Sequence, residues 1–285
     1  MPSEAMVERR EHIIGRSSKV GYANGAMKRK RCKRKIIKYE FTAPSPLQDL
    51  YEASREVFKG PGTVPSPQDV KRLCHMLDNM KPEAVGLSSK LQFFSPKMAV
   101  GNPRVTYTTI CKCDNFSMCI FFLPANAVIP LHNHPGMTVF SKLLLGTMHI
   151  KSYDWVDPPS TDDNSQPSKL KLAKLVADRD FTSPCDSSVL YPTTGGNMHQ
   201  FTAITPCAIL DVLGPPYSKE DGRDCSYYKD FPYSAYLNGD DRLTEEEGVS
   251  YGWLEETELP ADSQMDGIEY LGPQIVESIV AADRF

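Results

Sequence analysis

Three of the six histidines in this 285-residue chain stand in two short motifs that could together hold a metal ion. His132 and His134 form an H-x-H pair, and His199 follows the turn-prone Gly195 and Gly196. On a β-strand, side chains at positions i and i+2 leave the same face, so the H-x-H pair can direct both imidazoles at one point. A third His from a neighbouring strand would complete a mononuclear site with three neutral nitrogen ligands. The alternative is two surface histidines beside a turn and an unrelated core His.

Strands must position these residues, and from about residue 100 the sequence is rich in β-branched and aromatic residues. One hairpin is predicted over 105–123, and a second over 138–155 with its turn at Gly146. Further strands are expected at 169–176, 187–191, 199–205 and 207–213. Many short strands separated by turn residues indicate a mainly β sandwich or barrel, here over about residues 90–235.

Two helices are predicted between residues 45 and 80, before the strands begin. Ser45-Pro46 and Ser66-Pro67 each place a capping hydroxyl before a Pro suited to the first helical position, and Asp69 supports the second cap. Apolar residues recur at helical spacing after each cap. We expect these apolar faces to pack against the outside of the barrel, with the C-terminal segment as a further covering element.

Composition bounds the class of protein. With 40% hydrophobic residues, the chain can bury one substantial core. No run approaches eighteen apolar residues and the N-terminus lacks an apolar signal block, so we expect a soluble, intracellular protein without membrane contact. Eight cysteines without dense regular spacing favour free thiols in a reducing compartment.

Charge separates an N-terminal arm from the remaining chain. Residues 1–38 carry twelve Lys and Arg against three Glu, net +9, whereas the remainder carries net −13. We therefore predict a disordered basic arm over residues 1–40 and one domain over 41–285. The centre of the arm predicts a nuclear-import signal, with nonspecific nucleic-acid contact or a functionless tail as alternatives: Lys28, Arg29, Lys30, Arg31, Lys33, Arg34 and Lys35. Because the body is acidic, we do not expect direct DNA binding, and we expect a protein of nucleus and cytoplasm.

The histidine motifs resemble those of the cupin superfamily, a jelly-roll barrel with a metal site inside its mouth. The first cupin motif, G-x5-H-x-H-x3-4-E-x6-G, is matched in register by His132, His134 and Gly146. Asn126 replaces the leading Gly, which is tolerable because Asn accepts left-handed turns, and Val139 replaces the metal-binding Glu. The resemblance implies a cupin double-stranded β-helix in which the ligand set has become three histidines.

The second cupin motif, P-x-G-x2-H-x3-N, is met by Gly196 and His199, whereas Pro192 is displaced and Ala203 replaces the Asn. Cupins with three histidines and no Glu include the thiol dioxygenases. The segment LHNHPGMTVFSKLLLGTMHIKSYDW closely resembles the plant cysteine oxidases and their animal relative, cysteamine dioxygenase. The later runs AILDVLGPPYS and CSYY also resemble the plant enzymes, and the likeness extends from about residue 45 to the C-terminus.

This resemblance implies one Fe(II) per chain, with O2 as co-substrate. The implied reaction oxidises the N-terminal Cys of transcription factors, such as group VII ethylene-response factors, to the sulfinic acid. Arginylation and proteolysis of the product through the N-degron pathway would then make the enzyme an oxygen sensor of the hypoxia response.

The ligand types suit that chemistry. Three neutral imidazoles leave adjacent metal positions open and the 2+ charge uncompensated, which favours an anionic thiolate. Coordination lowers the pKa of the substrate thiol, and holding O2 beside it makes the reaction intramolecular.

Further candidates surround the three histidines. Asp211 is a lone acid in an apolar strand, and we expect it to contact the substrate amine; a salt bridge or a solvent-facing position is the alternative. Tyr217 is expected to line the entrance and hydrogen-bond substrate or oxygen, or else to be a packing residue. Cys225 and Tyr227 match the C-x-Y spacing of the thioether crosslink associated with the animal relative, although a Cys near a Tyr usually has no such role.

Three other functions remain open on the sequence alone. The same three-His site would suit a zinc-dependent hydrolytic or lyase enzyme, which needs no O2. A non-catalytic cupin binding module and a nuclear adaptor driven by the basic arm are the other two. We expect a monomer, because no heptad or long apolar edge is evident.

Overall fold

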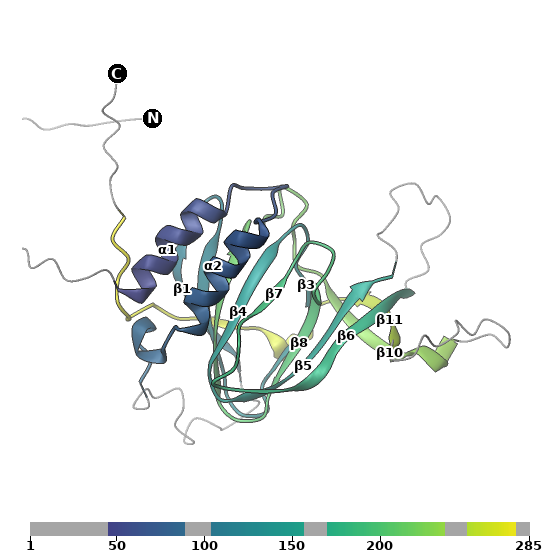
Figure 1. The fold of residues 1–285 in the computed structure, drawn as a ribbon. Helices are drawn as coiled ribbons and strands as arrows, with labels where there is room; N and C mark the ends of the chain where they lie inside the picture. Colours follow the sequence, from purple (N-terminus) through teal and green to yellow (C-terminus); the bar gives the residue numbers. More distant parts are fainter. Residues whose placement is uncertain (1–44, 89–103, 157–169, 237–249, 278–285) are drawn as a thin grey trace, which may run out of the picture. The chain divides into compact units, whose positions relative to one another are not determined.

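The computed structural model describes residues 45–88, 104–156, 170–236 and 250–277 (Figure 1). The predicted basic arm and its import signal lie outside these residues. Within them, no helix has the length and apolar character needed to cross a membrane. The cysteines that the structure describes are all free thiols, as predicted.

Two helices begin where the sequence predicts them. Helix α1 spans Pro46–Val57 and α2 spans Pro67–Asp78. The Ser45 hydroxyl accepts a hydrogen bond from the N–H of Gln48 at 3.2 Å. The Ser66 hydroxyl accepts one from the N–H of Asp69 at 3.2 Å and donates to the Asp69 carboxylate at 2.7 Å. These bonds satisfy N–H groups that the first helical turn leaves unpaired. A short 3-10 helix, η1, follows at Pro82–Val85.

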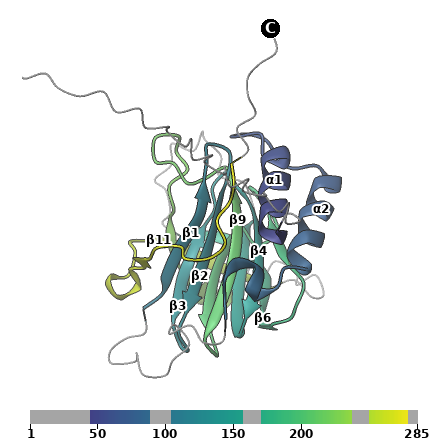
Figure 2. The same ribbon diagram turned by 90° about the vertical axis from the view of Figure 1, so that its left-hand side faces the viewer.

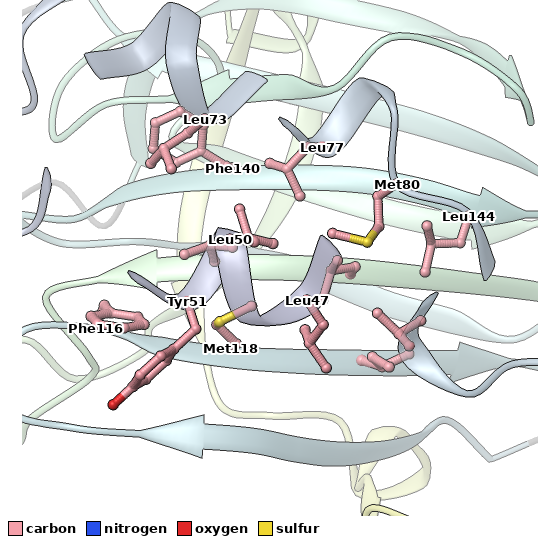
Figure 3. Packing of buried hydrophobic residues seen from close by; sticks show 14 of the residues in the cluster. Leu47, Leu50, Tyr51, Leu73, Leu77, Met80, Phe116, Met118, Phe140 and Leu144 are labelled. Atoms are coloured by element: carbon pink, nitrogen blue, oxygen red, sulfur yellow. The ribbon is translucent and has the colours of Figure 1, made fainter. Parts of the chain in front are cut away.

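The helices pack against the outer face of a six-stranded sheet, as predicted (Figure 2). In spatial order, its strands are β12 (Asp266–Gly267), β1 (Thr106–Lys112), β2 (Ser117–Leu123), β9 (Cys207–Gly214), β4 (Thr138–Leu145) and β7 (Ser188–Leu190). Figure 3 shows Leu47 and Leu50 of α1 and Leu73 and Leu77 of α2 directed at this sheet, where Met118 and others meet them. The two helices thus cover the outer face of the six-stranded sheet.

A second set of strands closes on itself as a barrel. Its order is β10 (Tyr227–Pro232), β11 (Tyr251–Thr257), β6 (Leu170–Thr182), β5 (Thr147–Trp155), β8 (Met198–Ala203) and β3 (Val128–Asn133). Strand β3 pairs with β10, and this pairing closes the barrel. Two further 3-10 helices are η4 (Tyr233–Tyr236) and η5 (Ala261–Ser263). A buried cluster joins the two sheets, with Leu143 and Ile209 from one and Met148 and Phe201 from the other. The prediction of a mainly β fold that contains a barrel and carries two helices on its outside is confirmed.

Two strand predictions need correction. The predicted second hairpin is wrong, because β4 and β5 lie in different sheets and the chain crosses between the sheets at Gly146. Gly146 has φ +91°, and a Cβ there would lie 2.3 Å from the carbonyl oxygen of Pro206. Glycine therefore permits a crossing here instead of a tight turn. In addition, β11 extends the barrel beyond residue 235, because Gly252 and Leu254 alternate inward between β6 and β10.

Alternation along β9 directs every second side chain into the space between the two sheets. Leu210 and Val212 belong to the cluster under the helices, whereas Ile209 packs in the cluster between the sheets. Since side chains alternate with period two, Asp211 shares the inward face with Ile209. An apolar strand thus carries one carboxyl group into the space between the two sheets.

Candidate metal centre

The three predicted ligands meet in the space between the two sheets. Their ring centroids lie 4.9 Å apart for His132 and His134, and 4.8 Å apart for each of these with His199. One potential ligand atom from each residue falls within 4.8 Å of the others. His132 and His199 are directly opposite each other on β3 and β8, and His134 follows the end of β3. The structure therefore contains a three-histidine metal site.

The separation of the ring nitrogens fits a shared ion. The Nε2 atoms of His134 and His199 are 3.0 Å apart. Two nitrogen ligands at right angles on one ion, with bonds of about 2.1 Å, would be separated by about 3 Å. The Nδ1 of His132 lies 2.8 Å from the carbonyl oxygen of Pro130, and that of His134 lies 2.9 Å from the Tyr217 hydroxyl. These partners favour the tautomers that leave both Nε2 lone pairs free for a metal.

The site holds neutral ligands. Burial lowers the pKa of His132, and it lowers the pKa of His134 and His199 well below the usual value, with repulsion among the rings adding to the effect. Val139, which replaces the cupin Glu, is buried in an apolar cluster with Leu190 and Leu213. The three imidazoles thus bring no negative charge, and an ion here keeps its charge for a substrate.

Asp211 lines the same cavity as the three histidines, and the cavity measures about 500 Å³. The side chain is only 4% exposed, and its Oδ1 has no hydrogen-bond partner within the described residues. Burial raises its pKa to about 7, against a hydrogen bond from Ser141 that lowers it. Both alternatives for Asp211, a salt bridge and a solvent-facing position, disagree with this placement. A buried acceptor without a partner is suited to a ligand's hydrogen-bond donor.

The Tyr217 side chain lines the cavity, and its hydroxyl contacts His134, one of the three predicted metal ligands. The hydroxyl donates to the carbonyl oxygen of Asn133 at 2.8 Å and can accept from His134 Nδ1 at 2.9 Å. It therefore orients His134, and contact with substrate or oxygen stays a prediction. Cys225 and Tyr227 also line this cavity. The thioether crosslink between them stays a prediction.

Sequence reasoning missed Asn197 and Asp154, which hold the main chain around two of the ligands. The Asn197 side chain bonds to both main-chain groups of His134, and the Asp154 carboxylate accepts from the N–H groups of Gly196 and Asn197. A polar residue within the Gly-Gly-x-x-His turn was the available signal, since turns that place a ligand need side-chain partners for their main-chain groups.

Comparison with known proteins places the site in a family. A family model described as PCO_ADO matches residues 76–275. Plant cysteine oxidase 2 of Arabidopsis thaliana is 49% identical, over 89% of this chain and 91% of its own length. Plant cysteine oxidase 1 of the same organism is also 49% identical, over 85% of each chain. Human 2-aminoethanethiol dioxygenase is 31% identical, over 73% of this chain and 82% of its own length.

Among solved structures, an RmlC-like cupin protein from Desulfovibrio desulfuricans matches with 16% identity and a TM-score of 0.29, covering 46% of this chain and 94% of that one. The match to the family model spans most of the described barrel and includes all three histidines. The chain therefore belongs to the PCO_ADO family of thiol dioxygenases.

Proposed function

We propose that this protein is an Fe(II)-dependent dioxygenase that oxidises the N-terminal Cys of regulatory proteins to the sulfinic acid, with O2 as co-substrate. The observation that carries the proposal is a buried three-histidine site without a carboxylate ligand, in a chain 49% identical to plant cysteine oxidases. Group VII ethylene-response factors are the proposed substrates. Their oxidation would feed the arginylation-dependent N-degron pathway and signal oxygen supply in nucleus and cytoplasm.

The chain's own residues divide the work. His132, His134 and His199 would hold the iron, which supplies the redox chemistry that joins O2 to a thiolate. Asp211 accepts a hydrogen bond from the substrate α-ammonium and thereby orients the Cys, since its Oδ1 has no partner among the described residues. Tyr217 keeps the imidazole of His134 in position.

The shape of the cavity supports a peptide substrate over a free thiol. A second cavity of about 450 Å³ shares Lys112, Pro216 and Tyr217 with the metal cavity. It lies between the β1–β2 turn and the loop around Ser218, and its lining includes several polar and charged side chains, among them Arg223. Each cavity is in the range of about 300–1,000 Å³ that suits a drug-sized ligand. Together they offer room for the residues that follow an N-terminal Cys.

Incubation of a Cys-initiated peptide with iron-loaded protein under oxygen-18 gas tests the reaction. We expect mass spectrometry to show two labelled oxygen atoms on the sulfur. Activity that follows zinc and is indifferent to Fe(II) and O2 would support the hydrolytic or lyase alternative and refute the proposal. Unmodified peptide under all metal conditions would leave a binding module as the function.

A ladder of peptides of increasing length, all beginning with Cys, should reveal the use of the second cavity. We expect kcat/KM to rise from free cysteine through the first added residues and then to level off, because residues beyond the cavity lie in water. Oxidation of all lengths at one kcat/KM would contradict this role while leaving the dioxygenase reaction intact.

Removing residues 1–38 is expected to change the location of the protein and to leave its turnover near normal. The removed segment carries net charge +9 and includes the predicted import signal, whereas all three histidines remain. Fluorescence microscopy of tagged chains and peptide oxidation assays check the two halves of this prediction. Unchanged nuclear accumulation would rule out an import signal in the arm.

A further inference from the structure

The β-ladder fixes two of the three histidines and stops before the third. His132 and His199 are a cross-strand pair, and the next pair, Asn133 with Met198, is the last between β3 and β8. His134 lies one residue beyond the end of β3. Its main chain therefore needs another partner to place its imidazole beside the other two.

Asn197 occupies the position that the ladder would reach next. Its Oδ1 accepts a hydrogen bond from the N–H of His134 at 3.2 Å. Its Nδ2 donates to the carbonyl oxygens of His134 at 2.9 Å and of Tyr191 at 2.7 Å. The residue is 8% exposed, and both amide protons are used. One side chain thus replaces the two main-chain bonds that a further ladder step would have supplied.

Asp154 holds Asn197 from the other side. Tyr153 and Met198 form the last pair between β5 and β8, so Asp154 stands where the ladder would reach Asn197. Its Oδ1 accepts from the N–H groups of Gly196 and Asn197, both at 2.9 Å. Gly196 has φ +83°, and a Cβ there would lie 2.6 Å from Ser152 Oγ, so only glycine lets the turn approach this closely.

We propose that Asn197, seated by Asp154, is a positioning residue that fixes the main chain of His134 against the other two ligands and thereby sets the affinity of the metal site. It acts through hydrogen bonds to the main chain and touches no reacting atom. The inference concerns metal binding, so it holds whichever thiol the enzyme oxidises. Asn197 can prove unimportant for metal affinity while the protein still oxidises an N-terminal Cys. Equally, Asn197 can set the metal affinity of a protein that catalyses another reaction.

Variants of Asn197 test this role. We expect Asn197→Ala and Asn197→Asp to weaken Fe(II) and Co(II) binding by about 10- to 100-fold, the usual cost of removing a partner that orients a metal ligand. Asn197→Asp keeps the acceptor for the His134 N–H. It replaces the donating amide nitrogen by an oxygen, which then faces the carbonyl oxygens of His134 and Tyr191. Both dissociation constants are measured anaerobically on apoprotein by competition with a chelator. The Co(II) absorption spectrum reports any change in ligand arrangement.

Asp154 supplies an independent pair of variants. Asp154→Asn keeps an oxygen that can accept both N–H bonds and should retain metal affinity close to that of the wild-type protein. Asp154→Ala loses the acceptor and should resemble the Asn197 variants. This contrast keeps the test decisive if an Asn197 variant does not fold.

Ser183→Ala is the matched control, because Ser183 also donates a hydrogen bond to a main-chain carbonyl, that of Leu144 at 2.8 Å. It should lower the melting temperature without changing metal affinity or the Co(II) spectrum. The positioning role is overturned if folded Asn197→Ala or Asp154→Ala, verified by circular dichroism, binds Fe(II) as tightly as the wild-type protein. Equal loss of affinity in Ser183→Ala would also overturn it, by showing a general effect of stability.

Discussion

Replacing His199 by alanine is expected to abolish metal binding at working concentrations and all peptide oxidation. Only His132 and His134 would remain, and the apolar cluster around Val139 offers no carboxylate to substitute for the lost nitrogen. Because changing a partner outside the ligand set already costs about 10- to 100-fold in affinity, losing a ligand should cost more than about 100-fold. Metal content after anaerobic loading and turnover of a Cys-initiated peptide measure the two effects.

His149→Ala is the control for this variant. His149 lies on β5 outside the cavity, where its two ring nitrogens are each 2.7 Å from a carboxylate oxygen, one of Asp178 and one of Asp180. It should bind metal and turn over peptide like the wild-type protein. If His199→Ala bound Fe(II) and oxidised the peptide like the wild-type protein, His199 would not be a metal ligand and the three-histidine cluster would not be the catalytic centre.

The metal ligands and helices could be predicted because their signals are local. The spacing of His132 and His134 and the Ser-Pro starts of α1 and α2 are each readable within a few residues, and Asn126 adopts φ +69°, as its place in the motif predicts. These features depend on backbone geometry near one position and little on distant parts of the chain. Resemblance to a known family then supplied the reaction class.

The missed features depend on which strands become neighbours. A Gly between two strands is compatible with a hairpin turn or with a connection between two sheets. At Gly146 the second is found, because β4 pairs with β9 in one sheet and β5 pairs with β8 in the other. Strand β11 was missed because acidic residues dominate its surroundings, whereas its inward positions fit the space between β6 and β10. Likewise, Asn197 has a role only because the register brings it beside His134.

Asp211→Asn is expected to lower kcat/KM for Cys-initiated peptides by about 10- to 150-fold, because a hydrogen bond to a charged group contributes about 1.5–3 kcal/mol. The carboxylate lies inside the metal cavity with one oxygen free of partners among the described residues. The amide keeps the shape but not the negative charge that attracts an α-ammonium group. An N-acetylated peptide separates this role from general damage, since wild-type protein and variant should oxidise it at the same low rate.

The pH dependence of kcat/KM for the same reaction should reflect the ionisation of Asp211. Burial raises the pKa of Asp211 to about 7, so the carboxylate that orients the amine forms only as pH approaches that value. We expect kcat/KM to rise with pH through a limb at or below about 7, because a bound 2+ ion favours the charged form. Asp211→Asn should remove the limb. Ser141→Ala should move it to higher pH, since it removes the hydrogen bond that lowers this pKa.

The stability of the apoprotein should fall as pH rises, whereas kcat/KM rises. A carboxyl group whose pKa is raised on folding binds its proton more tightly in the folded chain, so stability falls as pH rises from about 4 to about 7 and then levels. The raised pKa corresponds to at most about 4 kcal/mol, at about 1.4 kcal/mol per pKa unit. Asp211→Asn should therefore melt at a higher temperature than the wild-type apoprotein above pH 7, while being the poorer enzyme. A variant less stable at that pH, with an unchanged pH limb, would contradict both the buried charge and its role in orienting the substrate amine.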